Sequence, residues 1–209
     1  MTYEAKQVVT TVDEIRALIG EVYYTQDTKC IDHIDVHCKA WIERSPFLVI
    51  STMSNKGAID VAPKGDPLGS WLVLDEKTIA IPDRPGNNRA DTFVNILENP
   101  RAGLMFMIPN RREIVRVSGA ASICKDPDLL ARMEVGGKTP LLAILVHVEE
   151  AMFHCGKAVV RSKLWEPTAW ASVEGLPTYG EALVDHGKLS IAVDELNEGL
   201  QEHERTTLY

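Results

Sequence analysis

Short strands that follow one another without long crossovers constrain this fold most. Between residues 47 and 122, apolar or alternating runs are separated by turn residues at short intervals. Antiparallel strands can be joined by such tight turns, whereas parallel strands need crossovers of a dozen or more residues. Three hairpins are expected: 47–53 with 58–63, 71–74 with 78–81, and 101–108 with 112–122. We therefore predict a mainly β fold, an antiparallel closed or nearly closed barrel with peripheral helices.

Helical spacing appears before, between and after these strands. The segment 12–19 follows two threonines and stops at Gly20, and the segment 32–44 has Asp32 as its expected cap and ends before Pro46. We expect both to pack on the outside of the sheet or at an interface. Further helices are expected at 88–98, 126–133, 156–165 and 191–204, with an apolar strand at 141–148 and a short strand before 156.

The length and composition favour one domain of 209 residues with a sizeable core, since 45% of the residues are hydrophobic. Within it we expect N-terminal helices in 1–45, the barrel in 46–167 and a tail in 168–209. The net charge of −8 provides no basic face for nucleic acid or an anionic membrane. No leader or long apolar run is recognised, so we expect a cytoplasmic protein.

Four cysteines are too few and too unevenly spread for a disulfide framework, and we expect them to be reduced. Cys30, His33, His37 and Cys38 lie close enough in sequence to raise the question of zinc. On one helix, however, Cys38 would lie about 100° from His37. No second ligand pair completes a tetrahedral set. We expect an amphipathic helix here and no metal.

Residues 63–100 gather cations and backbone-permissive residues around an expected helix start. A helix N-terminus has unpaired N–H groups and partial positive charge, so it suits a phosphate group. The residues concerned are Lys64, Gly65, Arg84, Gly86, Asn87, Asn88 and Arg89. We interpret these cations as uncancelled and predict a phosphate-bearing cofactor. The alternative is a plain strand-to-helix connection with a capping Asn and solvated Arg side chains.

A second cationic face is expected on the helix 156–165, where Lys157 and Arg161 are four residues apart. The alternative is an exposed basic helix face without a ligand. Nucleophilic chemistry has little support, because there is no GxSxG elbow and His154 is only a sequence neighbour of Cys155. We assign no catalytic residue and expect a cofactor to carry any chemistry.

The order of these motifs resembles the pyridoxamine 5′-phosphate oxidase-like flavoprotein superfamily, in its branch of FMN-dependent proteins with PDRPGN and HCxKAxxRSxLW signatures. The resemblance covers about residues 32–167. It rests on STMSNKGAIDVAPKGD, IAIPDRPGNNRADTFVNILENPRAGLMF, EIVRVSGAA and FHCGKAVVRSKLWEP.

This resemblance implies a split-barrel homodimer that binds two FMN molecules at the subunit interface. The strand ending at Lys64 and Gly65 would contribute flavin and phosphate contacts, and Asn88 and Arg89 would form the phosphate-binding turn. The remaining cofactor-binding residues implied are Arg116, Lys157, Arg161, Ser162 and Trp165, on a later strand and the closing segment.

The closing Arg-x-His-Asp-Arg type motif of true pyridoxamine phosphate oxidases is absent, and HCGKAVVRSKLW stands instead. We therefore expect an FMN-dependent oxidoreductase with a small-molecule substrate and NAD(P)H as a possible electron donor. One alternative is a non-catalytic protein that stores or senses FMN. Another is a pyridoxamine phosphate oxidase-like activity with altered substrate contacts.

Overall fold

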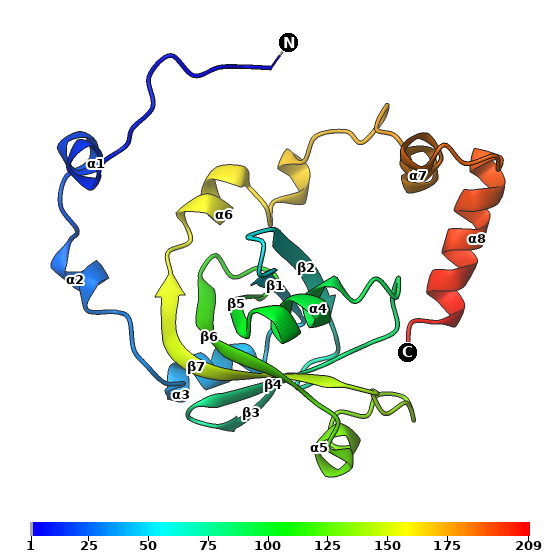
Figure 1. Cartoon of the computed structure of the whole chain (residues 1–209), viewed down its shortest axis with the longest axis horizontal. Coiled ribbons are helices and arrows are strands. Elements are labelled where there is room, and N and C mark those ends of the chain that lie inside the picture. The colour runs from blue at the N-terminus through cyan, green and yellow to red at the C-terminus, as the bar shows by residue number, and fades with distance from the viewer. Residues whose placement is uncertain (1) are drawn as a thin grey trace.

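The computed structural model describes residues 2–209 and contains a seven-stranded antiparallel sheet in the order β2-β1-β5-β6-β7-β4-β3 (Figure 1). The strands are β1 Phe47–Met53, β2 Ile59–Gly65, β3 Leu72–Asp75, β4 Thr78–Pro82, β5 Arg101–Met107, β6 Ile114–Cys124 and β7 Ala143–His154. The predicted mainly β, antiparallel fold with peripheral helices is confirmed, and its geometry is consistent with a split barrel.

The core lies on one face of the strongly curved sheet. In β1, Leu48 and Ile50 are completely buried while their neighbours are partly or largely exposed, and β5 repeats this alternation with Leu104 and Phe106. Such alternation is what a strand with one covered face requires. Trp71 adds a large buried ring whose Nε1 donates to the carbonyl oxygen of Ser45 at 2.6 Å. Burial of each large apolar side chain contributes about 1.5–3 kcal/mol.

The antiparallel pair β6–β7 is the longest strand pairing in the described chain. The sequence predicted a strand at 141–148 and a separate short strand, but β7 is continuous from Ala143 to His154. The register shifts where Ser118 and Gly119 of β6 pair with Glu150 and Val148, so Glu149 of β7 is the extra residue of a bulge. A Cβ atom on Gly119 would lie 1.9 Å from the carbonyl oxygen of His147, so this close approach of the two backbones requires glycine.

The helices are α1 Val12–Ile19, α2 Tyr24–Asp27, α3 Val36–Ile42, α4 Asp91–Glu98, α5 Pro127–Ala131, α6 Lys157–Ser162, α7 Tyr179–Gly187 and α8 Val193–Thr206, with a 3₁₀ turn at Pro167–Ala169. The predicted cap of α3 was wrong. Asp35 accepts from the backbone N–H of Cys38 at 2.8 Å, whereas Asp32 is held by Nζ of Lys77 at 2.9 Å. The helix therefore begins one turn later than predicted.

The helices differ in how they meet the sheet. Cys38 and Ile42 of α3 are buried in the core, which confirms the predicted packing for that helix. The predicted packing on the sheet is wrong for α1, because α1 contributes no buried residue and its apolar side chains are exposed. Figure 1 shows α1 and α2 on an arm that stands away from the sheet. Packing of α1 at an interface with another chain stays a prediction.

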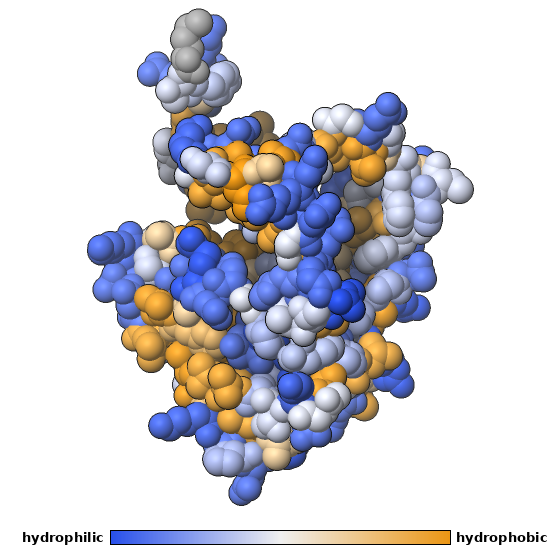
Figure 2. Space-filling model, turned by 90° about the vertical axis from the view of Figure 1, so that its right-hand side faces the viewer, coloured by the Kyte–Doolittle hydropathy of each residue, from blue (hydrophilic) through white to orange (hydrophobic). Residues whose placement is uncertain are grey.

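The chain after Trp165 forms a second arm, in which α7 was not predicted. Asn197 of α8 joins the two helices, since its Oδ1 accepts from the N–H of Gly180 at 3.0 Å and its Nδ2 donates to Thr178 at 3.1 Å. Apolar residues remain at the surface on the side that carries α7 and α8 (Figure 2). Within residues 2–209, no helix is long and apolar enough to cross a membrane.

Candidate functional site

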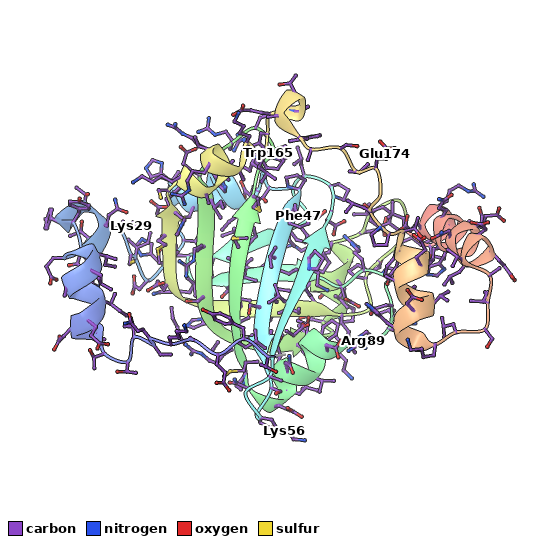
Figure 3. All side chains as sticks on the ribbon, turned by 90° about the horizontal axis from the view of Figure 1, so that it is seen from above. Lys29, Phe47, Lys56, Arg89, Trp165 and Glu174 are labelled. Carbon is purple, nitrogen blue, oxygen red and sulfur yellow. The ribbon has the colours of Figure 1, made fainter. Side chains whose placement is uncertain are left out.

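A cleft of about 770 Å³ lies between the end of β2, the loop that connects β4 to α4, and the end of the second arm. The wall from β2 includes Lys64 and Gly65, and the loop contributes Asn88 and Arg89. These four residues are the part of the predicted cofactor-binding set that the cleft brings together. Figure 3 shows Arg89 beside α4, toward the opposite end of the strands from Trp165.

Local sequence explains why the loop and the helix start face this cleft. Pro82 is the last paired residue of β4, and Pro85 follows in the loop. Further along the loop, Asn88 and Ala90 take left-handed conformations with φ of 57° and 59°. Between these two residues, the backbone N–H of Arg89 donates to Oδ1 of Asn87 at 3.0 Å and so helps to shape the loop. Among the described residues no side chain caps α4 at Ala90, so the N–H groups of its first turn keep their capacity for a ligand.

Two hydrogen bonds fix the position of α4 over the sheet. Thr92 Oγ1 donates to Asp60 Oδ2 of β2 at 3.0 Å, and Asn95 Nδ2 donates to Thr52 Oγ1 of β1 at 3.1 Å. Thr52, Thr92 and Asn95 are buried, so these contacts are protected from water. The helix start is therefore held rigidly at the cleft.

The prediction that the cations here are uncancelled was wrong. Each cation lies beside a carboxylate: Lys64 Nζ is 3.5 Å from Asp83 Oδ1, Arg84 Nε is 2.7 Å from Asp66 Oδ2, and Arg89 Nε is 2.6 Å from Asp91 Oδ2. The first two pairs cross between the end of β2 and the end of β4, which sequence spacing does not reveal. Only the Arg89–Asp91 pair, two residues apart, could have been read from the sequence.

The three pairs differ in how readily a ligand could replace the carboxylate. The side chains of Arg89 and Asp91 are 70% and 43% exposed, and the hydrogen bond from Arg89 to Asp91 raises the pKa of the guanidinium further. The side chains of Arg84 and Asp66 are 13% and 0% exposed. Removing one partner of a buried pair leaves an uncompensated charge, whereas an exposed pair separates at little cost. Arg89 is therefore available to an anion, and Arg84 is not.

The closing segment lies outside this cleft. Lys157 and Arg161 share the exposed face of α6 and line a separate hollow of about 580 Å³ with Cys155. Trp165 lines a smaller hollow of about 330 Å³, and its Nε1 donates to the carbonyl oxygen of Arg111 at 2.8 Å. The predicted helix was too long, because Lys163 is left-handed with φ of 52° and ends α6 at Ser162.

Two further predicted residues also lie apart from the cleft. Arg116 is exposed on β6, opposite Met105 and Met152, and its charge adds to burial in lowering the pKa of His154. Ser162 Oγ donates to the carbonyl oxygen of Val159 at 3.1 Å and so serves its own helix. The predicted set therefore divides, within one chain, between the cleft and the surface around α6 and β6.

Two residues of the cleft, Asp66 and Tyr209, were not predicted from the sequence, and neither was the pairing of Arg84 with Asp66. The Tyr209 ring centroid lies 5.6 Å from Cζ of Arg84, and both residues line the cleft. Tyr209 is 125 positions from Arg84 in the numbering, and no local pattern links them. Their association depends on the course of the second arm.

The four residues considered for zinc do not converge. Cys38 is buried, and burial raises the pKa of its thiol to about 12, while Cys30 is exposed. His33 lies before α3 and contacts Asp32. Among residues 2–209, no group of three or more His, Cys, Asp or Glu side chains is placed to hold a metal ion.

Comparison with known proteins identifies one matching family. The family model described as "Pyridoxamine 5'-phosphate oxidase" matches residues 34–155, more than half of the chain. No curated protein matches the sequence.

Solved structures with a similar arrangement have low sequence identity. HupZ of Group A Streptococcus is 21% identical, with 56% of this chain and 91% of that chain covered and a TM-score of 0.47. A putative pyridoxamine 5'-phosphate oxidase from Lactobacillus delbrueckii is 18% identical, with 60% and 99% covered and a TM-score of 0.48. A conserved hypothetical protein from Mycobacterium tuberculosis is 15% identical, with 84% and 99% covered and a TM-score of 0.43.

Proposed function

The chain belongs to the pyridoxamine 5′-phosphate oxidase family, and we propose that it binds FMN in the cleft and acts as an FMN-dependent oxidoreductase on a small-molecule substrate. The observation that carries this proposal is the meeting of the uncapped α4 N-terminus with Lys64 and Arg89 in one cleft. We further propose that residues 46–167 form the flavin-binding unit of a single domain, flanked by 1–45 and 168–209.

The residues present fit a phosphate monoester. Arg89 would exchange its exposed, solvent-screened contact with Asp91 for a charge-assisted contact with the phosphate, which is the stronger of the two. Lys64 would add a second charge, because its contact with Asp83 is long at 3.5 Å. Asn88 and Gly65 line the same cleft. A volume of about 770 Å³ lies within the usual range of about 300–1,000 Å³ for small-molecule sites.

We propose that a second copy of the chain completes the site. The predicted cofactor-binding residues that do not line the cleft of their own chain, as the structure describes it, would then reach the flavin from the partner subunit. They are Arg116, Lys157, Arg161, Ser162 and Trp165. The exposed apolar side chains of Ile59 and Val61 on the edge strand β2 favour association. A two-fold homodimer would repeat this arrangement at both sites.

When bound, FMN supplies hydride transfer at its N5 atom. The residues of the chain bind and orient the cofactor. Lys64, Arg89 and the N–H groups of α4 hold the phosphate and fix the position of the ring relative to a substrate. Cations from the partner's α6 would stabilise negative charge that develops on the pyrimidine side of the ring.

The proposal is tested by purifying the protein, extracting any chromophore and titrating the colourless protein with FMN, FAD and riboflavin. We expect FMN to be bound in preference to FAD, because the sequence has no GxGxxG fingerprint for a pyrophosphate. Anaerobic addition of NAD(P)H or another donor should bleach the flavin, and air should restore it. Binding of FAD alone, or of no flavin, would reject the cofactor assignment. FMN that no donor reduces would favour the storage or sensing role.

A further inference from the structure

Asp66, Arg84 and Tyr209 form a distinct group in the cleft, and we propose that Asp66 and Arg84 are a subsite for a planar aromatic ring that carries a hydrogen-bond donor, such as a phenol or an N–H heteroaromatic. Tyr209 occupies this subsite in the structure. The subsite would hold the substrate of the proposed oxidoreductase, so its role in catalysis rests on that proposal. The capacity of the subsite to bind such a ring does not depend on the proposed function.

Asp66 supplies an unused acceptor. Its side chain is fully buried, and Oδ2 accepts from Nε of Arg84 at 2.7 Å. Oδ1 is also buried and has no hydrogen-bond partner with normal geometry among the residues described. A buried carboxylate oxygen without a donor is unfavourable, and burial accordingly raises the pKa of Asp66. A ligand that presents an O–H or N–H group to Oδ1 would relieve this cost.

Arg84 supplies a fixed, flat surface. Its Nε donates to Asp66 and its Nη2 donates to the carbonyl oxygen of Met133 at 2.9 Å. Because two edges of the guanidinium are engaged, its plane cannot rotate freely, and its face remains for stacking. The charge of Arg84 is already balanced by Asp66, so this part of the cleft does not favour a phosphate. A neutral aromatic ring is the better match.

Tyr209 shows which chemistry the subsite accepts. The centre of its ring lies 5.6 Å from Cζ of Arg84, and its phenol group partly opposes the burial that raises the pKa of Asp66. It therefore presents both features at once, a planar ring and a hydroxyl donor. The hydroxyl nevertheless makes no hydrogen bond of normal geometry to Oδ1 within the described chain, so the fit is incomplete.

Tyr209 can leave without disturbing the core. It follows α8, which has no buried residue and packs mainly on α7, and Figure 1 shows α8 running back toward the loop between β4 and α4. Tyr209 is thus a built-in competitor for the subsite. A ligand with the same two features would displace it, and removing the ring should open the subsite.

The experiment measures binding of 4-methylphenol to the full chain by calorimetry, with 4-methylanisole as a matched probe that lacks the donor. Tyr209→Ala is expected to bind 4-methylphenol about tenfold more tightly than the wild type. It should also prefer 4-methylphenol over 4-methylanisole by about tenfold or more, the usual effect of one buried hydrogen bond. Tyr209→Phe, which keeps the ring, should bind nearly as weakly as the wild type.

Asp66→Asn in the Tyr209→Ala background should abolish the preference for 4-methylphenol over 4-methylanisole, provided that its thermal unfolding shows a folded protein. If that variant does not fold, the comparison of Tyr209→Ala with Tyr209→Phe decides. Equal affinity of the wild type and Tyr209→Ala, or equal binding of the two probes by Tyr209→Ala, would overturn the subsite. FMN titration is run separately. Phenol binding without FMN binding would support the subsite and reject the proposed function, and the reverse result would reject the subsite alone.

Discussion

Arg89 and Asp91 form an ion pair at the cleft, with Nε 2.6 Å from Oδ2. Asp91 therefore competes with a bound phosphate for the guanidinium. Asp91→Asn is expected to tighten FMN binding about 1.4- to 5-fold, because it removes one solvent-screened ion pair that competes with the phosphate. Quenching of flavin fluorescence measures this, with riboflavin as the control that should not respond. Weaker FMN binding in this variant would make Asp91 a supporting residue instead of a competitor.

Arg89→Ala is expected to weaken FMN binding about 10- to 150-fold, since it removes a charge-assisted contact worth about 1.5–3 kcal/mol. The same titration with riboflavin should change far less, because riboflavin lacks the phosphate. Comparable losses for the two ligands would show that Arg89 does not contact the phosphate. Arg132, exposed on the surface after α5, provides a matched Arg→Ala control that should leave both affinities unchanged.

Heterodimers test whether Arg89 and Arg161 serve one flavin from opposite subunits. A wild-type chain is paired with a chain that carries both Arg89→Ala and Arg161→Ala. If each site uses Arg89 of one chain and Arg161 of the other, both sites of this heterodimer are damaged. The expected result is no tight FMN site, measured by equilibrium titration of the isolated heterodimer. One tight site per heterodimer would reject the cross-subunit assignment.

Gly119→Ala should destabilise the fold by about 1–3 kcal/mol or more, because the added Cβ would overlap the carbonyl oxygen of His147. Gly103→Ala on the neighbouring strand β5 is the matched control, since nothing lies within 4 Å of its Cβ position. Its effect should stay within about 0.5 kcal/mol. Urea unfolding monitored by tryptophan fluorescence compares the two variants. Similar losses of stability in both variants would show that the close approach of Gly119 to His147 is not the cause of the destabilisation.

Cys38 should resist alkylation in the folded protein. Burial raises the pKa of its thiol to about 12, so at pH 8 only roughly one thiol in ten thousand is ionised. Iodoacetamide at pH 8 should therefore modify the exposed Cys30 and Cys155 first, as read by peptide mass spectrometry. In urea all four cysteines should react. Modification of Cys38 at the rate of Cys155 before unfolding would contradict its burial.

Local patterns predicted the fold wherever the determining residues are neighbours in the chain. The bounds of β1 follow from an apolar run that ends at a turn, and those of α1 follow from Thr11 and Gly20. The start of α3 could not be predicted in this way, because Asp32 and Asp35 are both suitable N-cap residues. Asp32 does not cap the helix because its carboxylate accepts a hydrogen bond from Lys77, which is distant in the sequence. The helix α7 could have been predicted from the sequence, since Thr178 and Glu181 have the spacing of a capping box and form one in the structure.

The candidate site was predictable only in part for the same reason. The loop between β4 and α4 carries its own turn and charge signals, so Asn88 and Arg89 could be singled out from the sequence. The pairing of Arg84 with Asp66 depends on two strand ends meeting, and the position of Tyr209 depends on the whole second arm. Such contacts between residues far apart in the chain cannot be predicted from the local spacing of residues. The division of the predicted cations between the cleft and α6 likewise required the fold.

The sheet order has a consequence for synthesis of the chain. Thr78 of β4 pairs with His147 of β7, so β4 has no second neighbour until about 70 further residues have been made. At roughly 5–20 residues per second, the nascent β3–β4 hairpin waits about 3–14 s with one edge open. Ile79 and Ile81, fully buried in the finished protein, remain uncovered for that time. This hairpin is therefore the segment that a chaperone on the ribosome would protect from aggregation.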